Sequence, residues 1–191
     1  MLPHKFYYYL FALWQSSALA VEFDCSITAT AQWMLNTQNG HSQALNLALL
    51  PEFNANFDNG WQLKSRARLR FEAIDGLQIN DVSRDTYSPY SRPAELHDGI
   101  ELELREFYLQ GAIGDSYLTI GKQQVVWGKS DGIKVLDIVN PQSFREFILD
   151  DFDSSRIPLW TINIERSFGD WDMQFLWIPD PTYHSLPSQN A

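Results

Sequence analysis

The sequence lacks several features that would assign it to a familiar class. It has a single cysteine, Cys25, so no disulfide can form within the chain. Lys and Arg number only 14 against 24 Asp and Glu, and this acidity argues against a nucleic-acid partner. After the first twenty residues, no uninterrupted apolar run approaches the length of about twenty residues that a transmembrane helix needs. A nucleic-acid-binding protein and a helical membrane protein are both disfavoured.

Catalytic motifs are missing as well. Neither G-x-S-x-G nor H-E-x-x-H occurs in the sequence. His41, His97 and His184 lie in or near predicted loops, and no Ser or Asp partner has motif spacing. We therefore predict no enzymatic activity and no cofactor.

The first twenty residues have the three parts of a secretory signal peptide. Lys5 follows the start, Phe6–Leu13 is apolar, and Ala18-Leu19-Ala20 forms a small-residue cleavage site before Val21. The sequence thus predicts an exported chain, with residues 1–20 as a signal peptide and 21–191 as the mature part. A buried N-terminal helix is the alternative for this segment.

The clearest pattern in the mature chain is a two-residue alternation from Ala44 to Ala73. Successive side chains of a β-strand point to opposite faces, so this pattern predicts a strand pair with one apolar and one polar face. Asp58-Asn59-Gly60 supplies a hairpin turn between the strands. In the second strand Trp61, Leu63, Ser65, Ala67, Leu69, Phe71 and Ala73 share one face, and Gln62, Lys64, Arg66, Arg68, Arg70 and Glu72 share the other. In the first strand Leu47, Leu49, Phe53 and Phe57 alternate with Asn46, Glu52, Asn54 and Asn56.

Aromatic residues suggest what the apolar face meets. Trp61 and Phe71 are ten residues apart on that face, which corresponds to roughly 25 Å along the axis of a tilted barrel strand, the height of the apolar band in outer-membrane barrels. Trp160, Trp171 and Trp177 lie in further predicted strands, and all five aromatics are predicted at the lipid interface. The alternative is a secreted, Trp-rich β-sandwich that binds carbohydrate.

Seven strands are predicted, and the connections between them alternate in length. Longer connections (36–43, 75–99 and 128–156) alternate with tight turns (58–60, 111–115 and 167–170), as in outer-membrane barrels. A β-bulge near Arg105–Glu106 would bring the apolar residues of its strand onto one face. The pattern predicts an antiparallel up-and-down transmembrane β-barrel with its long connections outside. The strands are Ile27–Leu35, Ala44–Phe57, Trp61–Ile74, Ile100–Gln110, Tyr117–Trp127, Ile157–Arg166 and Trp171–Ile178.

The long connection 128–156 is predicted to have structure of its own. Asn140-Pro141 is typical of a helix start, and the helix Gln142–Leu149 would carry Phe144, Phe147 and Ile148 on one side. Three acids follow it: Asp150, Asp151 and Asp153. A calcium site through Asp151, Asp153 and Ser155 would lack the glycine and the distal glutamate of an EF-hand, so no metal is predicted.

Five motifs stand out in the second half of the chain: Gly121-Lys-Gln-Gln-Val-Val-Trp-Gly128, Asp131-Gly-Ile-Lys-Val-Leu-Asp137, Asn140-Pro141, Phe144-Arg-Glu-Phe147 and Asp153-Ser-Ser-Arg-Ile-Pro-Leu-Trp160. They resemble a family of proteobacterial outer-membrane proteins catalogued as a domain of unknown function, near the alginate-export porins. The resemblance covers roughly 102–186 and implies an outer-membrane β-barrel channel. Members are more than twice as long as this chain, so the chain is expected to be an N-terminal portion of a barrel or to oligomerise to close one.

The predicted function is a bacterial outer-membrane channel or porin that passes small polar or lipid-like solutes. About seven strands leave two edges unpaired, so an open sheet is expected instead of a sealed barrel. The predicted partners are outer-membrane lipid, a small-molecule solute, and export or uptake components of the envelope. We predict that the long connection folds into the lumen and presents its acids to the basic column. The predicted pore-lining residues are Glu52, Lys64, Arg66, Arg68, Arg70, Asp150, Asp151 and Asp153.

Overall fold

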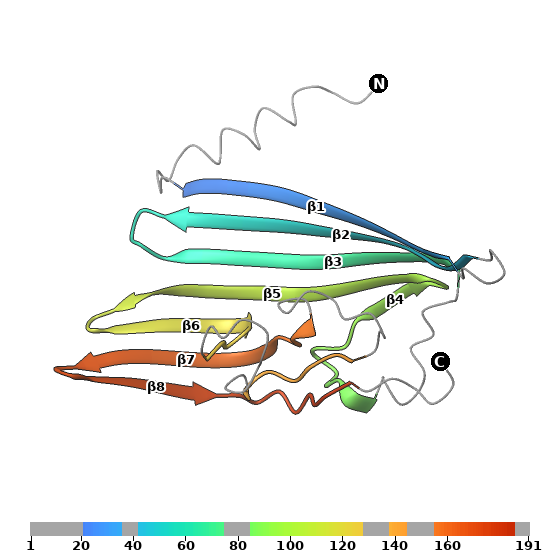
Figure 1. The fold of residues 1–191 in the computed structure, drawn as a ribbon. Helices are drawn as coiled ribbons and strands as arrows, with labels where there is room; N and C mark the ends of the chain where they lie inside the picture. The colour runs from blue at the N-terminus through green and yellow to red at the C-terminus, as the bar shows by residue number, and fades with distance from the viewer. Residues whose placement is uncertain (1–20, 36–41, 75–84, 128–137, 145–154, 186–191) are drawn as a thin grey trace, which may run out of the picture.

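The computed structural model describes residues 21–35, 42–74, 85–127, 138–144 and 155–185. They form one open antiparallel sheet in the order β1-β2-β3-β5-β6-β7-β8, and β4 pairs with β5 outside this path (Figure 1). The strands are β1 (Val21–Leu35), β2 (Ser42–Phe57), β3 (Gln62–Ile74), β4 (Ala94–His97), β5 (Ile100–Ile113), β6 (Ser116–Gln123), β7 (Leu159–Phe168) and β8 (Trp171–Trp177). The predictions of an all-β antiparallel chain and of an open sheet are confirmed.

The predicted β-bulge is also present. Arg66 lies opposite Glu106 and Ala67 lies opposite Leu104, so Arg105 has no partner on β3. Such an extra residue shifts the alternation by one position. Phe107 therefore lies opposite Ser65, on the same face as Leu104, although the two residues are an odd number apart.

The connections alternate in length as predicted. Tight turns join β2 to β3, β5 to β6, and β7 to β8, and each contains a glycine with positive φ: Gly60, Gly114 and Gly169. In Figure 1 these turns lie together at one end of the sheet. Residues 155–158 of the longest connection and residues 178–185 after β8 contact the sheet again, through Arg156 and Asp180.

The largest differences between the predicted and the observed strands concern β1, β6 and β4. β1 begins at Val21, six residues early, because its first residues pair with Phe57 and its neighbours on β2. β6 ends at Gln123 and not at Trp127, since its partner β7 begins opposite that residue, at Leu159. β4 was not predicted: it is only four residues long, and it folds back on β5 through the turn at Gly99.

The helix predicted from Gln142 is wrong in the part that the structure describes. Gln142 bridges to Arg156, and Ser143 bridges to Ser185. The amide of Ser143 donates to the carbonyl of Ser155 (2.7 Å) and that of Phe144 to the carbonyl of Ser185 (2.8 Å). The carbonyl of Gln142 also accepts from the amide of Ser185 (3.0 Å), so residues 142 and 143 pair with two other segments as β-bridges, which requires extended and not helical backbone. Residues 145–149 of the predicted helix, like the signal peptide 1–20, lie outside the described residues.

Within the described residues, no helix has the length and apolar character that crossing a bilayer would need.

Candidate functional site

One face of the sheet is apolar and exposed, and we call it the apolar face. Cross-strand register aligns it across the sheet: Leu49 lies opposite Leu69, and Leu69 lies opposite Leu102. Further along, Ile120 lies opposite Ile162, which lies opposite Trp177. Its exposed large side chains include Phe23, Ile27, Trp33, Leu47, Leu102, Leu104, Phe107, Ile120, Ile164, Trp171, Met173, Phe175 and Trp177.

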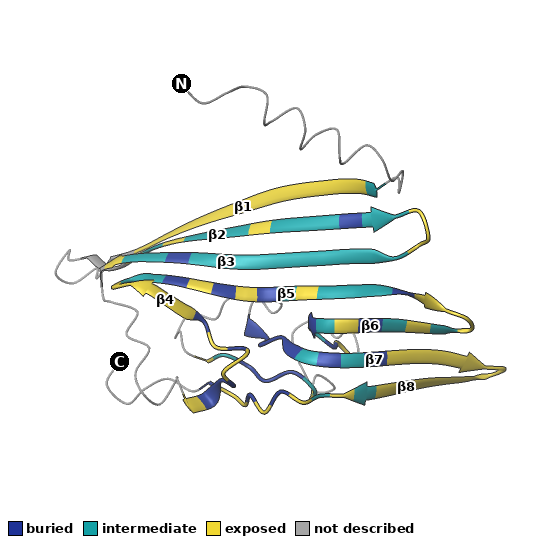
Figure 2. Cartoon of the chain, turned by 180° about the vertical axis from the view of Figure 1, so that it is seen from behind, coloured by how far each residue is buried: buried dark blue, intermediate teal, exposed yellow. Residues whose placement is uncertain are grey.

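The opposite face carries charge on both β3 and β5, and we call it the charged face. It is buried along the first half of β5, whereas among the described side chains of β3 only Arg70 is buried. On β5 the buried residues Glu101, Glu103 and Arg105 alternate with the exposed Leu102 and Leu104. Figure 2 shows this alternation as dark and light bands along β5. On β5, burial is therefore inverted relative to a protein folded around an apolar core in water.

Acids of neighbouring strands compensate the basic column predicted on β3. Glu52 of β2 forms an ion pair with Arg66 at 2.8 Å, and Arg68 forms one with Glu103 of β5 at 2.7 Å. In register, Arg70 lies opposite Glu101. Opposite charges on facing residues stabilise a strand pair, so the column is part of a cross-strand charge ladder.

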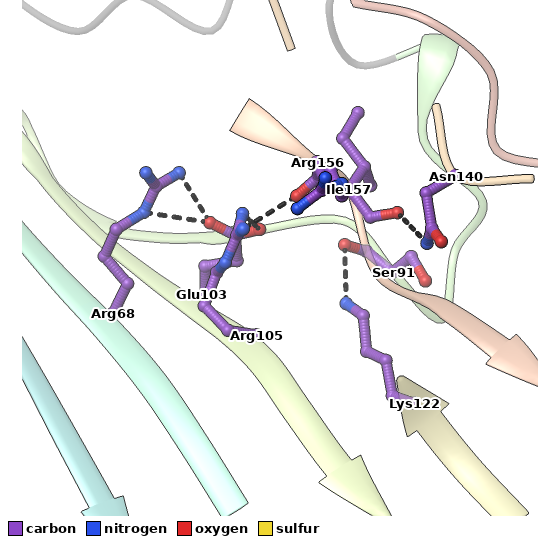
Figure 3. A network of polar contacts seen from close by, with 8 residues as sticks. All are labelled: Arg68, Ser91, Glu103, Arg105, Lys122, Asn140, Arg156 and Ile157. Atoms are coloured by element: carbon purple, nitrogen blue, oxygen red, sulfur yellow. Dashed lines mark hydrogen bonds and ion pairs between the residues drawn. The ribbon is translucent and has the colours of Figure 1, made fainter. Parts of the chain in front are cut away.

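Glu103 is the centre of the ladder (Figure 3). Its Oε2 accepts hydrogen bonds from Nε (3.0 Å) and Nη2 (2.7 Å) of Arg68. Its Oε1 accepts from Nη1 of Arg105 at 3.1 Å. Glu103 is 2 % exposed, and a carboxylate removed from water to this degree requires such charge-assisted bonds.

Four segments from the long-connection end cover the charged face. We call them the loop layer: residues 85–93, 139–144, 155–158 and 178–185. In Figures 1 and 2 they gather beside β5, β6 and β7, away from β1 and β2. Buried polar residues are common in them, including Ser91, Asn140, Ser155, Asp180 and Ser185.

Two cations of the sheet bind main-chain carbonyls of the loop layer (Figure 3). Nη2 of Arg105 donates to the carbonyl of Arg156 at 2.7 Å. Nζ of Lys122 donates to the carbonyl of Ser91 at 3.3 Å. The acceptors belong to two different connections, one between β3 and β4 and one between β6 and β7.

The predicted site residues divide into three groups. Lys64, Arg66, Arg68, Arg70 and Glu52 lie on the strands as predicted, with Arg70 buried. Asp150, Asp151 and Asp153 lie outside the described residues, so their approach to the basic column stays a prediction. Phe144, predicted on the apolar side of a helix, is 39 % exposed, and its ring lies 6.2 Å from the ring of His184.

The predicted interface aromatics differ in their exposure and in their contacts. Trp171 and Trp177 are exposed on the edge strand β8. Trp61 packs against the backbone at Gly111, where an added Cβ would lie 2.5 Å from its indole ring. Trp160 is only half-buried, and its Nε1 donates to the carbonyl of Tyr90 at 3.2 Å. It thus contacts the loop layer, which makes it the least suited of these residues to a lipid contact.

Sequence reasoning missed Glu101, Glu103, Arg105, Lys122 and Asp180. For the first three a signal was present, because alternation with Leu102 and Leu104 puts them on the face of the basic column. For Lys122 the alternation gives no signal, because Gly121, with φ of +133°, interrupts the strand pattern. As a result, the consecutive residues Lys122 and Gln123 are both buried. No pattern in the sequence indicates the position of Asp180.

Comparison with known proteins gives no further guide. No protein-family model matches the chain, and neither a curated protein nor a solved structure matches it. The family resemblance of residues 102–186 therefore stays a prediction. Among the residues described, no group of His, Cys, Asp and Glu is arranged to hold a metal ion.

Proposed function

We propose that this chain forms part of the wall of an outer-membrane β-barrel that acts as a channel or porin for small polar or lipid-like solutes. The observation that carries the proposal is the inverted burial along β5, where the charged residues are buried and the alternating leucines are exposed. In a barrel wall the apolar face contacts lipid and the polar face lines the lumen.

The extent of the apolar face supports lipid as its solvent. Monomeric proteins in water rarely expose contiguous apolar patches larger than on the order of a few hundred Å². Here exposed apolar side chains occur from Trp33 on β1 to Trp177 on β8, at opposite edges of the sheet. A bilayer removes the cost of hydrating this surface.

Aromatic residues occur near both ends of the strands, as the interfacial girdles of barrels do. Trp61 and Trp171 are at the tight-turn end: Trp61 immediately precedes β3, and Trp171 begins β8. Phe71 and Trp177 are near the ends of β3 and β8, toward the long connections.

Binding of carbohydrate by a β-sandwich is the weaker alternative. A sandwich would cover the apolar face with a second sheet, and the described residues form one sheet only. Sugar-binding aromatics would also gather in one groove, whereas Trp33 and Trp171 lie on opposite edge strands.

A charge placed on the apolar face tests the proposal. Leu104 is exposed, so in a water-soluble protein Leu104→Arg would change stability by about 0.5 kcal/mol or less. In a barrel wall the same substitution costs about 2–4 kcal/mol near the bilayer midplane. We therefore expect Leu104→Arg to reduce assembly into the membrane fraction strongly.

Asn54→Arg is the matched control, because Asn54 alternates with apolar residues and lies opposite Lys64 on the polar side. Its membrane assembly should match that of the wild type. Recovery of the wild-type protein in buffer, without detergent, would contradict the proposal.

Conductance in planar bilayers tests whether the barrel is a channel. Replacing Arg66 and Arg68 with Gln should shift the reversal potential toward cation selectivity, and an unchanged potential would exclude these residues from the pore.

A further inference from the structure

The charged face changes character toward the tight turns. Cross-strand register aligns one row of its residues across β2, β3, β5, β6 and β7. Side-chain amides occupy every position of this row but one, and a hydroxyl occupies that one, so the row is uncharged, unlike the ladder around Glu103. We call it the amide row, and its members are Asn56, Gln62, Gln110, Thr119 and Asn163.

We propose that the amide row, together with Tyr117 and Trp127 beside it, binds uncharged oligosaccharides in the lumen of the proposed channel. This inference rests on the proposed function, because it names the class of solute that the channel would pass. The row is in part accessible: Gln62 and Gln110 are half-buried, and Tyr117 is 40 % exposed.

Gln62 and Gln110 form the centre of the row. Nε2 of Gln110 donates to Oε1 of Gln62 at 2.8 Å. This bond aligns the two side chains and does not use the amino group of Gln62 or the carbonyl oxygen of Gln110. A hydroxyl group both donates and accepts, and a side-chain amide offers N–H donors and a carbonyl acceptor. The pair can therefore satisfy both capacities of a sugar hydroxyl without any charge.

A second set of bonds orients the polar groups at the β7 end of the row. Nδ2 of Asn163 donates to Oε1 of Glu165 at 2.8 Å, and Nε2 of Gln174 donates to Oδ1 of Asn163 at 3.1 Å. Nε1 of Trp127 donates to Oε1 of Gln174 at 2.7 Å. These bonds do not use Oε2 of the exposed Glu165, which is an acceptor for a further hydroxyl donor.

Two aromatic side chains beside the amide row supply contact surface for the apolar C–H faces of sugar rings. Tyr117 precedes Thr119 by two residues on β6, so it shares the same face, and it lies opposite Glu165. Trp127 is 38 % exposed, and its bond to Gln174 holds it on the charged face. Lipid contact does not explain aromatic residues on this face of a barrel wall. The negative face of an aromatic ring attracts C–H groups.

The length of the amide row suits a chain of sugar units. Neighbouring strands lie about 4.8 Å apart, so the four steps from Asn56 to Asn163 span about 19 Å. A single sugar ring would contact only part of this distance. We therefore infer an oligosaccharide that lies across the strands and contacts several amides at once.

Charges beside the amide row favour an uncharged solute. Glu22 of β1 lies opposite Asn56 at one end of the row, and Glu165 accepts from Asn163 at the other end. Lys64 lies on the same face of β3, in the neighbouring row. An anionic chain would meet an acid at each end, and a cationic chain would meet Lys64. Juxtaposed like charges oppose binding.

Titration calorimetry on the full chain in lauryldimethylamine oxide micelles tests the site. This detergent has no sugar headgroup and therefore does not compete. The probes are maltohexaose and cellohexaose, which are uncharged, and hexagalacturonate, an anionic chain of the same length. We expect the wild-type protein to bind one or both uncharged probes, and to bind hexagalacturonate about tenfold more weakly.

Gln110→Leu removes the central amide at nearly constant side-chain volume. It should weaken binding of the uncharged probe about tenfold, because the sugar hydroxyls then lose a polar partner on desolvation. Gln32→Leu is the matched control. Gln32 is an exposed amide of the same face, opposite Asn46 at the other end of β1, and its replacement should leave the affinity unchanged.

Two variants separate the ring of Trp127 from its hydrogen bond. Trp127→Ala removes both and should weaken binding about tenfold. Trp127→Phe loses the bond to Gln174 but keeps an aromatic face, so it should retain most of the affinity. Equal losses in the two variants would overturn the contact between the ring and the sugar.

The remaining outcomes distinguish this inference from the proposed function. Binding of neither uncharged probe by the wild type, equal or tighter binding of hexagalacturonate, or an unchanged affinity of Gln110→Leu would each overturn the amide row as an oligosaccharide site. A wild-type protein that conducts ions in bilayers but binds neither uncharged probe would overturn this inference alone. Recovery of the wild type in buffer without detergent would instead overturn the proposed function, and the same titration in buffer would still test the amide row.

Discussion

Strands β1 and β5 have the same alternation of apolar and polar residues but very different burial. On β1, Phe23 and Ile27 alternate with Asp24 and Thr28, and both faces are exposed. On β5 the apolar Leu102 and Leu104 are also exposed, yet the alternating Glu103 and its charged neighbours are buried. Alternation thus determines the face on which a side chain lies, whereas the loop layer determines whether that face meets solvent.

Removing one charge from β5 and one from β1 should give the largest contrast in the free energy of unfolding. Glu103→Gln leaves Arg68 and Arg105 buried without their carboxylate, and breaking a buried ion pair costs about 3–5 kcal/mol. Asp24→Asn on β1 changes an exposed carboxylate and should alter the free energy of unfolding by about 0.5 kcal/mol or less. Urea unfolding of both variants in micelles measures the difference, and similar losses would show that the loop layer adds nothing to the burial of β5.

Two glycines sharpen the contrast between the covered region and the free tight-turn end. At Gly121, with φ of +133°, an added Cβ would lie 2.2 Å from the carbonyl oxygen of Phe107. Gly121→Ala should therefore cost about 3 kcal/mol, the upper range for a strained residue. At Gly60, with φ of +81°, no atom lies within 4 Å, so Gly60→Ala should cost about 1 kcal/mol. Urea midpoints in the reverse order would contradict this reading of the β6 backbone.

The smallest effect is expected from pH, acting on the loop layer alone. Burial raises the pKa of Asp180, but hydrogen bonds from the hydroxyls of Ser91 and Thr182 and from the amide of Trp160 outweigh it, so the pKa is lowered. The folded state then binds fewer protons than the unfolded state, and the stabilisation by Asp180 is complete above the ordinary pKa of about 3.9. It is lost as the pH falls through the lowered pKa.

We therefore expect the wild-type protein to lose more stability than Asp180→Asn between pH 6 and pH 2, since the amide does not titrate. Urea midpoints at several pH values measure this. Parallel curves for the two proteins would show that Asp180 does not contribute to the acid sensitivity.

The sheet could be predicted from the sequence because its signals are local. The alternation from Lys64 to Arg70 and the glycine turn at Gly60 each depend on a few adjacent residues. The bulge at Arg105 followed from one break in an otherwise regular pattern. For these features, sequence spacing and position in the sheet are directly related.

The loop layer could not be predicted because its contacts join distant segments without periodicity. Ser88 and Thr182 are 94 residues apart, and nothing near either of them indicates the pairing. The Asn140-Pro141 signal for a helix failed because Gln142 and Ser143 form β-bridges with Arg156 and Ser185, which are distant in the sequence. Pairing partners of the basic column were missed for a related reason: Glu103 is 35 residues from Arg68 in the sequence.

The direction of the edge strands constrains anything that completes the sheet. Six antiparallel pairings connect β1 to β8 along the path, so the two edge strands run in the same direction. Joining them directly, or joining two copies that have the same orientation, would create a parallel pair. An entirely antiparallel ring requires an odd number of additional strands between β8 and β1, with the first and the last running from the long-connection end to the tight-turn end.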